Sequence, residues 1–461
     1  MRLGFDARIF SQNFLRRNAR GDSPQLEISQ RNSNNSVTRK MNFSKLMEKE
    51  LPRYPRKEVL ALSKTRVKPF DVENTLAEAT EARKCQARKY HGPDSLLYSA
   101  IYPIVPILKA LGLAPYDFAG DQLVPSNYYL LFSFICMGTY SYCIRNVCIR
   151  FLAVKREKMI LNVVETAKVL VNYLIAMYDL ISVIFARKAF CRIWNALQDF
   201  DERLSQLGYP RKEVKTRIAA WVLLIVQIVI WTVINQSGMF AFHESWPFNM
   251  SYMCLYVTNA SSVYKFFGMA SFLGQRFHQL NQIARDNLPS RVGYKSTSVS
   301  RKTIQELHDE LMLSGESLGS LYSWSLFFWL GNLSVHIISN LYLIIDWFIV
   351  TNAYSLSWPV IFNTSCWLLG YMGQLLALHI VCDYTITEAN FTAVTLVEWD
   401  ARVVERYPHK DTVRTTLHFL NRRLNFSAGG FFDVKLSLLC SIVGVMSTYL
   451  IILLEFPSTS S

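Results

Sequence analysis

The sequence predicts an all-α membrane protein with seven transmembrane helices and a cytoplasmic helical layer. Three observations support this fold class. Apolar residues make up 51% of the 461 positions and charged residues only 18%, which is unusual for a soluble protein of this length. The apolar residues cluster in windows of about 20 residues, the length that crosses a hydrocarbon core. Lys and Arg gather in alternate connecting segments, as expected of the cytoplasmic side of a membrane protein.

Seven windows have the length and composition of membrane spans. They cover residues 128–147, 169–186, 218–240, 248–273, 321–350, 358–382 and 434–456. Residues 96–114 are also apolar, but Pro103 and Pro106 interrupt them, so we expect an interfacial segment that leads into the first span.

Three regions divide the chain. Residues 1–90 are polar and basic and lack the apolar core of a signal peptide; we expect a largely disordered cytoplasmic arm. Residues 91–456 form the seven-helix unit, and residues 457–461 form a short extracellular tail. The cysteines, nine in number and mostly within spans, indicate no disulfide framework.

Charge sets the expected orientation. The connections after the second, fourth and sixth spans are rich in Lys and Arg, whereas residues 241–247, 351–357 and 457–461 contain none. This bias places the N-terminus inside and the C-terminus outside, the reverse of a G-protein-coupled receptor. The basic residues 150–158, on the predicted outer side, depart from the rule. The net charge of +14 thus follows from topology and favours anionic lipid over nucleic acid as a partner.

Motifs near the C-terminus resemble the insect gustatory receptors, a family of inverted seven-helix chemoreceptors related to insect odorant receptors. The family's last helix carries Thr-Tyr, five hydrophobic residues, Gln and Phe; here Thr448, Tyr449 and Phe456 match, and Glu455 replaces the Gln. Further similarity lies at residues 424–433, at 382–392 and at 112–116. The sugar-receptor branch has Glu after Thr-Tyr, where this chain has Leu450, which argues against that branch.

The resemblance implies a gustatory chemoreceptor in the plasma membrane of sensory neurons. Such receptors are ligand-gated, non-selective cation channels opened by a small-molecule tastant. They assemble as tetramers, here either a homotetramer or a hetero-oligomer with related receptors, with the last helix lining a central pore.

One stripe of the last helix suits a pore lining. Thr448, Ile451, Ile452 and Glu455 follow the i, i+3, i+4, i+7 spacing of one helical face. Four copies around an axis would form an apolar constriction and a ring of carboxylates that attracts cations. The alternative is that the isoleucines pack against a neighbouring helix and Glu455 lies among lipid head groups.

Candidate ligand contacts lie in the outer halves of spans two to six. They are polar or aromatic: Tyr173, Trp231, Asn235, Tyr252, Tyr256, Asn340, Asp346, Trp347, Trp358 and Asn363. A pocket with apolar walls and a few polar groups suits a small organic molecule, and Asp346 could pair with a cationic one. Interfacial anchoring is the alternative for each Trp and Tyr.

The cytoplasmic connections show helical patterns. Residues 388–407 carry an apolar stripe that Pro408 ends, and residues 412–424 continue it. The stripe comprises Phe391, Val394, Val397, Ala401 and Val404. We expect these segments to build the contacts between subunits; packing within one chain is the competing interpretation.

Other function classes fit less well. Tyr178-Asp179 resembles half of an intramembrane aspartyl protease, but the partner carboxylate motif is missing. Gly315-Glu-Ser-Leu-Gly319 fits Gly-x-Ser-x-Gly outside its strand-turn-helix context. We therefore expect no enzyme, no catalytic residue, no cofactor and no metal. A membrane transporter, or another multi-spanning protein without channel activity, is the alternative function, although internal repeats are not detectable.

Overall fold

The computed structural model describes residues 90–153, 159–288, 299–350, 358–404 and 422–455. The chain divides into two units, Met1–Val72 and Glu73–Ser461. All described residues belong to the second unit. The predicted arm, the extracellular tail and most of the segment 412–424 lie outside the described residues.

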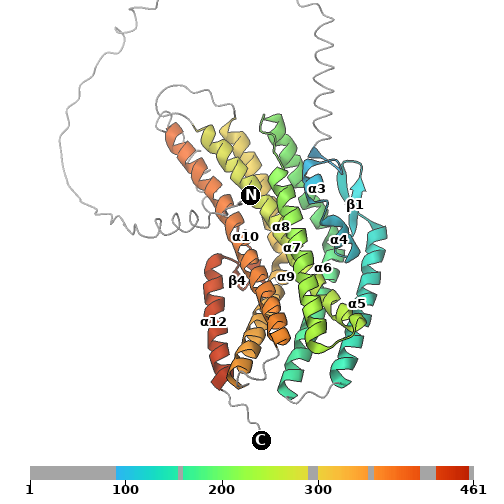
Figure 1. The fold of residues 1–461 in the computed structure, drawn as a ribbon. Coiled ribbons are helices and arrows are strands. Elements are labelled where there is room, and N and C mark those ends of the chain that lie inside the picture. Colours follow the sequence, from blue (N-terminus) through green and yellow to red (C-terminus); the bar gives the residue numbers. More distant parts are fainter. Residues whose placement is uncertain (1–89, 154–158, 289–298, 351–357, 405–421, 456–461) are drawn as a thin grey trace, which may run out of the picture. The chain divides into compact units, whose positions relative to one another are not determined.

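The described part of the second unit is a helical bundle with two small hairpins (Figure 1). Its long helices are α5 (Asn127–Ala153), α6 (Met159–Gln206), α7 (Val214–Phe242), α8 (Trp246–Asp286), α9 (Arg301–Val350), α10 (Trp358–Val404) and α12 (Leu436–Glu455). The short helices are α3 (Leu96–Ile101) and α4 (Val105–Ala110), and the strands are β1 (Tyr116–Ala119), β2 (Gln122–Pro125), β3 (Ser427–Ala428) and β4 (Phe432–Asp433).

Each predicted span window coincides with one long helix. By length and composition, five helices of the described residues could cross a membrane, namely α6, α7, α9, α10 and α12. Helices α5 and α8 are long enough, but the mean hydropathy of their most apolar span-length window is lower than that of these five helices. For α8 the cause is its buried polar residues, such as Asn259, Ser262 and Lys265, which the surrounding helices shield from lipid. The chain is therefore a multi-pass helical protein, while the count of seven spans and their orientation stay predictions.

Helix length separates two layers. Helices α6, α9 and α10 have 48, 50 and 47 residues, or about 70–75 Å at 1.5 Å per residue, whereas a hydrocarbon core is about 30 Å thick. Helix α12 has 20 residues, about 30 Å, and lies along only part of α10 (Figure 1). It begins beside Asp383, whose Oδ1 accepts from the Leu436 amide at 3.4 Å. The long helices therefore continue past the start of α12 into a second layer.

The helix expected over residues 388–407 is confirmed as far as Val404. These residues are not a separate element, because α10 runs unbroken from Trp358 to Val404. The buried face of this stretch is formed by Ala389, Ala393, Leu396 and Trp399, and Val394 of the predicted stripe is 52% exposed. Val394 is therefore not buried in the described part of the chain, and the choice between contact with another subunit and packing within one chain stays a prediction.

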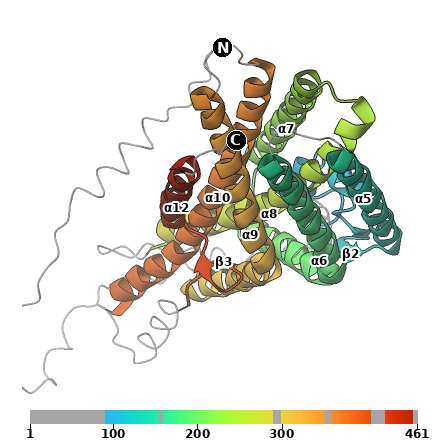
Figure 2. The same cartoon turned by 90° about the horizontal axis from the view of Figure 1, so that it is seen from below.

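Helix α8 is the centre of the bundle and contacts α5, α6, α7, α9 and α10, as the view along the helices in Figure 2 shows. Glycine permits its closest approach to α10. A Cβ on Gly274 would lie 2.8 Å from Thr385 Oγ1, closer than packed atoms allow, and Thr385 Oγ1 donates to the Ala270 carbonyl at 2.9 Å.

The segment before α5 is not a continuous helix, as its prolines predicted. Helices α3 and α4 have six residues each, and strands β1 and β2 follow as an antiparallel hairpin that pairs Tyr116 with Pro125. Side chains of the long helices attach this segment to the bundle, among them Ser133 and Lys265. Ser133 Oγ donates to the Gly112 carbonyl at 2.7 Å, and the buried Lys265 Nζ donates to the Leu113 carbonyl at 2.8 Å.

The glycines of the Gly-x-Ser-x-Gly match have a packing role. Both lie inside α9, so the strand-turn-helix context of a hydrolase nucleophile is absent there. A Cβ on Gly315 would come within 2.9 Å of Leu424 Cδ1, and one on Gly319 within 3.4 Å of Phe426 Cδ1. The two glycines thus open a groove for the segment that leads through β3 and β4 into α12.

Candidate functional site

A cavity of about 150 Å³ lies between α6, α7, α8, α9 and α10, at the end of the bundle away from the second layer. We call it the outer cavity. Its lining comprises Glu165, Lys168, Ile234, Gly238, Phe242, Glu244, Phe248, Asn249, Tyr252, Met253, His336, Asn340, Leu343, Asn363, Thr364, Trp367 and Tyr371. Five helices supply these residues, so a molecule bound there would contact most of the bundle at once.

Aromatic rings form one wall of the outer cavity. Tyr371 stacks on His336 with ring centroids 4.5 Å apart and on Trp367 at 5.5 Å. Tyr252 and Tyr256 meet the edge of Trp367 at 6.1 and 4.9 Å. Such a wall offers both ring faces and ring edges to an apolar or aromatic ligand.

Asparagine side chains hold the wall helices together. Asn249 Nδ2 donates to the carbonyl and to Oδ1 of Asn235 at 2.9 and 2.8 Å. Asn363 Nδ2 donates to the Ile234 carbonyl at 2.9 Å and to Ser237 Oγ at 2.8 Å. These bonds fix α7 against α8 and α10, so the cavity is preformed by polar contacts in its wall.

A buried ion pair lies in the lining of the outer cavity. Lys168 Nζ lies 2.6 Å from Glu165 Oε1, and the side chains are only 5% and 15% exposed. Lys168 Nζ also donates to Ser339 Oγ of α9 at 3.1 Å. The pair is neutral overall, and Glu244 adds a further carboxylate to the lining, so the cavity suits a ligand that carries a polar group.

A second cavity of about 420 Å³ lies between α4, α7 and α8. Apolar side chains dominate its lining, with Gln227, Trp231 and Asn235 among the polar members. Trp231 also meets the edge of Trp367 at 5.7 Å, and Met253 lines both cavities. The two cavities therefore share part of one wall.

The structure brings together six of the ten predicted ligand contacts. Tyr252, Asn340 and Asn363 line the outer cavity. Tyr256 belongs to its aromatic wall, while Trp231 and Asn235 line the second cavity.

The other four do not join that group. Tyr173 lies apart and shares a hydrogen bond of 2.9 Å with Ser141. Trp358 is 71% exposed and lines neither cavity. This exposure fits the alternative role of Trp358 as an interfacial anchor. Asp346 and Trp347 belong to α9, but their side chains lie outside the described residues.

Sequence reasoning missed five important lining residues. Trp367 and Tyr371 follow an i, i+4 spacing that puts two rings on one helical face. Glu165 and Lys168 are charges at the start of an apolar window, and charges inside a membrane often mark functional sites. His336 likewise interrupts an apolar run. The predicted set of ligand contacts used none of these signals.

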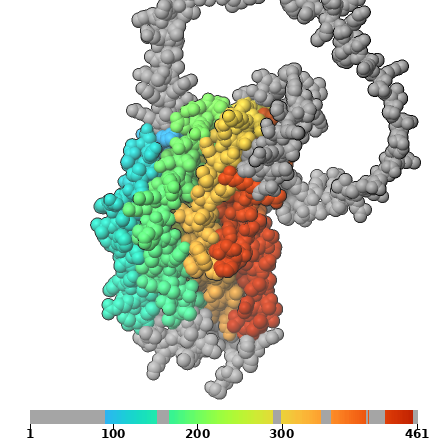
Figure 3. All heavy atoms as spheres, turned by 180° about the vertical axis from the view of Figure 1, so that it is seen from behind, coloured from blue at the N-terminus to red at the C-terminus, as the bar shows by residue number. Residues whose placement is uncertain are grey.

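The last helix contacts the bundle along one narrow stripe. Leu438, Ile442 and Met446 of α12 pack against the core, next to α9 and α10. In the space-filling view α12 (red) forms an edge of the molecule (Figure 3). The predicted pore residues Thr448 and Ile452 are exposed and, at 100° per residue, lie about 160° and about 120° around the helix from the buried Met446.

The remaining members of the pore and motif set are only partly described. Ile451 is 57% exposed, and Tyr449 also 57%. Glu455 is the last residue of α12, and its side chain lies outside the described residues, as does all of Phe456. What is established is that α12 leaves one apolar face without a partner from its own described chain.

The protease-like Asp179 has a structural environment. Its carboxylate accepts hydrogen bonds from Ser325 Oγ at 3.0 Å and from Trp329 Nε1 at 2.8 Å. Both donors come from α9, so Asp179 joins α6 to α9. The described residues place no second carboxylate against it.

Comparisons with known proteins identify the family. The sequence profile of the 7tm chemosensory receptor family matches residues 101–459. A putative gustatory receptor 2a of Drosophila melanogaster is 31% identical over 167 residues, which span 38% of that relative and 31% of this chain.

Solved structures agree on the fold. The insect olfactory receptor OR5 from Machilis hrabei aligns with a TM-score of 0.53 and 16% identity, over 77% of this chain and 97% of that chain. The same receptor in complex with eugenol aligns with a TM-score of 0.53 over 78% of this chain and 98% of that chain. A family of receptors, rather than enzymes, thus accounts for the sequence motifs and for the helical bundle. The chain belongs to the 7tm chemosensory receptor family.

Proposed function

We propose that this chain is a gustatory-type chemoreceptor that works as a ligand-gated, non-selective cation channel. A small-molecule tastant binds in the outer cavity and opens a pore lined by α12. The observation that carries the proposal is the free apolar face of α12 in a chain that also contains a preformed ligand cavity.

The outer cavity supports the ligand site. It combines an aromatic wall, several asparagines, a buried ion pair and the carboxylate of Glu244, which together suit an organic molecule with a polar group. Its volume of about 150 Å³ is small, so a larger tastant requires the wall side chains to move. Five helices line it, so ligand binding has a direct route to α9 and α10, the helices that contact α12.

The exposed face of α12 supports the pore. A single helix cannot enclose a conduit, so the channel requires several chains around an axis. Four copies would place the Ile451 and Ile452 side chains in a ring that blocks ions by excluding water. Thr448 and Glu455 would lie on either side of this constriction.

The second layer supports the assembly. Val394 of α10 is 52% exposed, although it belongs to a layer that we propose to lie in the cytoplasm and not in lipid. Exposed apolar residues in water favour contact with another subunit. We propose a homotetramer or a hetero-oligomer with related receptors, with membrane lipid around α7 and the outer surface of α5.

Topology is tested with epitope tags. In the proposed orientation a tag after Ser461 is reached by antibody on intact cells, whereas a tag before Met1 is reached only after permeabilisation. Labelling of the N-terminal tag on intact cells contradicts the orientation and removes the basis for the pore assignment.

Channel activity is tested with purified protein in a planar bilayer. A tastant found by screening sugars, bitter alkaloids and amino acids on expressing cells should evoke discrete cation currents. Uptake of the tastant into vesicles without such currents supports the transporter alternative instead.

A further inference from the structure

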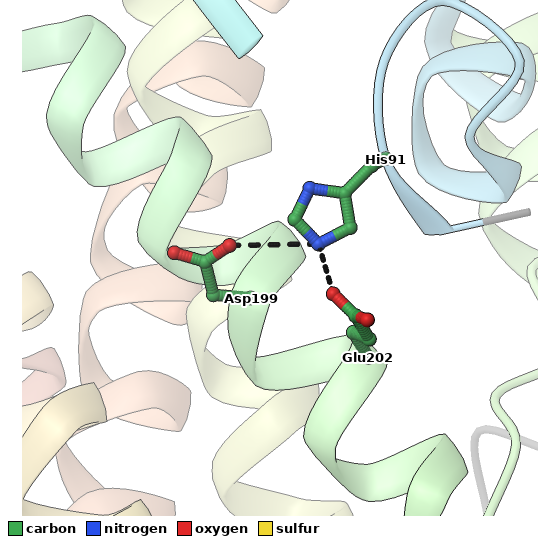
Figure 4. A group of neighbouring side chains, drawn as sticks. All are labelled: His91, Asp199 and Glu202. Carbon is green, nitrogen blue, oxygen red and sulfur yellow. Dashed lines mark ion pairs between the residues drawn. The ribbon is translucent and has the colours of Figure 1, made fainter. Parts of the chain in front are cut away.

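His91, Asp199 and Glu202 form a cluster outside the ligand cavity and the pore helix. Their three side chains each offer one ligand atom, and these atoms lie within 4.8 Å of one another. His91 Nε2 lies 3.5 Å from Asp199 Oδ1 and 2.5 Å from Glu202 Oε2. Figure 4 shows the imidazole nitrogen pointing between the two carboxylates, which project from one face of α6.

The chemistry of the cluster matches a transition-metal site. One imidazole nitrogen and two carboxylate oxygens are ligands that Zn²⁺ accepts, with a water in the fourth position. Two carboxylates and a neutral imidazole carry a charge of about −2 in total, which a divalent cation balances. His91 Nε2 is shielded from solvent and makes no hydrogen bond of regular geometry within the described residues.

The distances leave a small adjustment for a metal to enter. Zinc bonds of about 2.1 Å in a tetrahedron put two ligand atoms roughly 3.4 Å apart. The separation of 3.5 Å between His91 and Asp199 is close to that value, whereas Glu202 must withdraw by about 1 Å from His91. The Glu202 side chain is 26% exposed and thus has room to change rotamer.

The backbone that follows His91 is fixed before any metal binds. Gly92 has φ +70° and packs against the turn between β1 and β2, where a Cβ would lie 3.2 Å from Asp121 Cα. Ser95 Oγ caps α3 by accepting from the Tyr98 amide at 3.0 Å. The same oxygen accepts from Gln198 Nε2 of α6, also at 3.0 Å.

Helix α6 therefore positions all three ligands. Gln198, next to Asp199, holds α3, and Asn195, one turn earlier, exchanges hydrogen bonds of 2.9 and 3.1 Å with the Leu123 backbone of β2. Asp199 and Glu202 themselves share a face by their i, i+3 spacing. His91 is held over that face by contacts that do not involve its own ring.

We propose that His91, Asp199 and Glu202 bind a divalent transition metal, with Zn²⁺ as the best fit. The metal joins the start of the described chain to the part of α6 beyond the predicted membrane span. It stabilises the attachment of α3 and of the β1–β2 hairpin to the bundle, independently of the proposed channel activity.

The test measures metal bound to the purified full-length receptor. Wild type is equilibrated with micromolar Zn²⁺, freed of excess metal and analysed by plasma mass spectrometry, and Co²⁺ is used in parallel for its visible absorption. The variants are His91→Ala and Glu202→Gln. The control is His278→Ala, because His278 faces the single carboxylate of Glu388 at 3.1 Å and lacks a third ligand.

We expect about one Zn²⁺ per chain in wild type and in His278→Ala, and a loss of at least about 100-fold in affinity in both cluster variants. Zn²⁺ should raise the melting temperature of wild type and of His278→Ala. It should not raise the melting temperature of His91→Ala or of Glu202→Gln. If His91→Ala does not fold, the metal content of Glu202→Gln alone tests the proposal. Equal metal content in wild type and Glu202→Gln, or no metal in wild type, overturns the proposal and leaves the cluster a salt bridge. Neither readout requires channel activity, so failure here is distinct from failure of the proposed function.

Discussion

Replacing Arg276 tests how the second layer is held together. The Arg276 side chain is fully buried in α8. It contacts Asp201 of α6, donates to the Phe272 carbonyl at 3.0 Å and lies 3.8 Å from Glu213. Arg276 thus joins the ends of α6 and α8 to the start of α7. Arg276→Met removes this charge without removing the bulk of the side chain.

The expected loss of stability follows from the buried carboxylates that remain after Arg276 is replaced. Asp201 and Glu213 are 6% and 5% exposed in their side chains, and loss of Arg276 leaves Asp201 without its ion-pair partner. Breaking a buried pair from one side costs about 3–5 kcal/mol, because the remaining charge stays desolvated. The matched control is Arg203→Met on the same helix as Asp201. Its pair with Glu310 is 54% and 39% exposed, and such a pair contributes only about 0–1 kcal/mol.

Thermal unfolding of detergent-solubilised receptor, followed by size-exclusion fluorescence, compares the two variants. Arg276→Met should lower the melting temperature by many degrees and Arg203→Met by little. The double variant Asp201→Asn with Arg276→Met should recover part of the loss, since it removes the stranded charge. If Arg276→Met melts no lower than Arg203→Met, the buried cluster does not hold the layer together.

Four further predictions follow from single sites. Trp367→Ala should raise the half-maximal tastant concentration about tenfold, equivalent to about 1.4 kcal/mol of lost contact, whereas Trp358→Ala, at 71% exposure, should not change it. Burial acts to raise the pKa of Glu213, but two neighbouring arginines outweigh it and the pKa lies below its usual value. Its stabilising contribution is therefore present above about pH 4.5 and is lost as the pH falls through the folded-state pKa, so melting curves of Glu213→Gln should depend less on acid than those of wild type. Gly274→Val should lower thermal stability by about 1–3 kcal/mol, because its side chain would overlap α10. Glu455→Gln should preserve assembly and tastant response but reduce cation conductance in single-channel records. Equal conductance and equal pH dependence of variant and wild type would contradict the proposed ring of carboxylates.

Local apolar content predicted the helices well because a membrane span is encoded by composition over one continuous window. Residues 248–273 were predicted as a span, yet α8 is not among the five helices apolar enough to cross a membrane. Its Asn259 and Lys265 are shielded by other helices, with Asn259 Nδ2 donating to Asn172 Oδ1 at 2.6 Å, and no local pattern reveals such a partner. Along α10 the periodic stripe that contains Val394 differs from the face that packs in the core, which includes Leu396 and Trp399.

Sites that join distant segments were the hardest to predict. The outer cavity was found in part, because Tyr252 and Asn363 are polar or aromatic residues in apolar windows, which is a local signal. Its ion pair and stacked rings become meaningful only once five helices are in place. His91 is far from Asp199 and Glu202 in sequence, and only the folding of α3 onto α6 reveals the cluster.

The central claim is that cations pass along the free face of α12. It is tested most directly by modifying single cysteines with a charged thiol reagent during tastant-evoked current, in a background where the exposed Cys440 is serine. Ile452→Cys lies on the free face and Met446→Cys on the packing face. The account predicts rapid block of current at position 452 and none at position 446. Block at 446 alone, or unchanged current after complete labelling of 452, would contradict a pore lined by this face of α12.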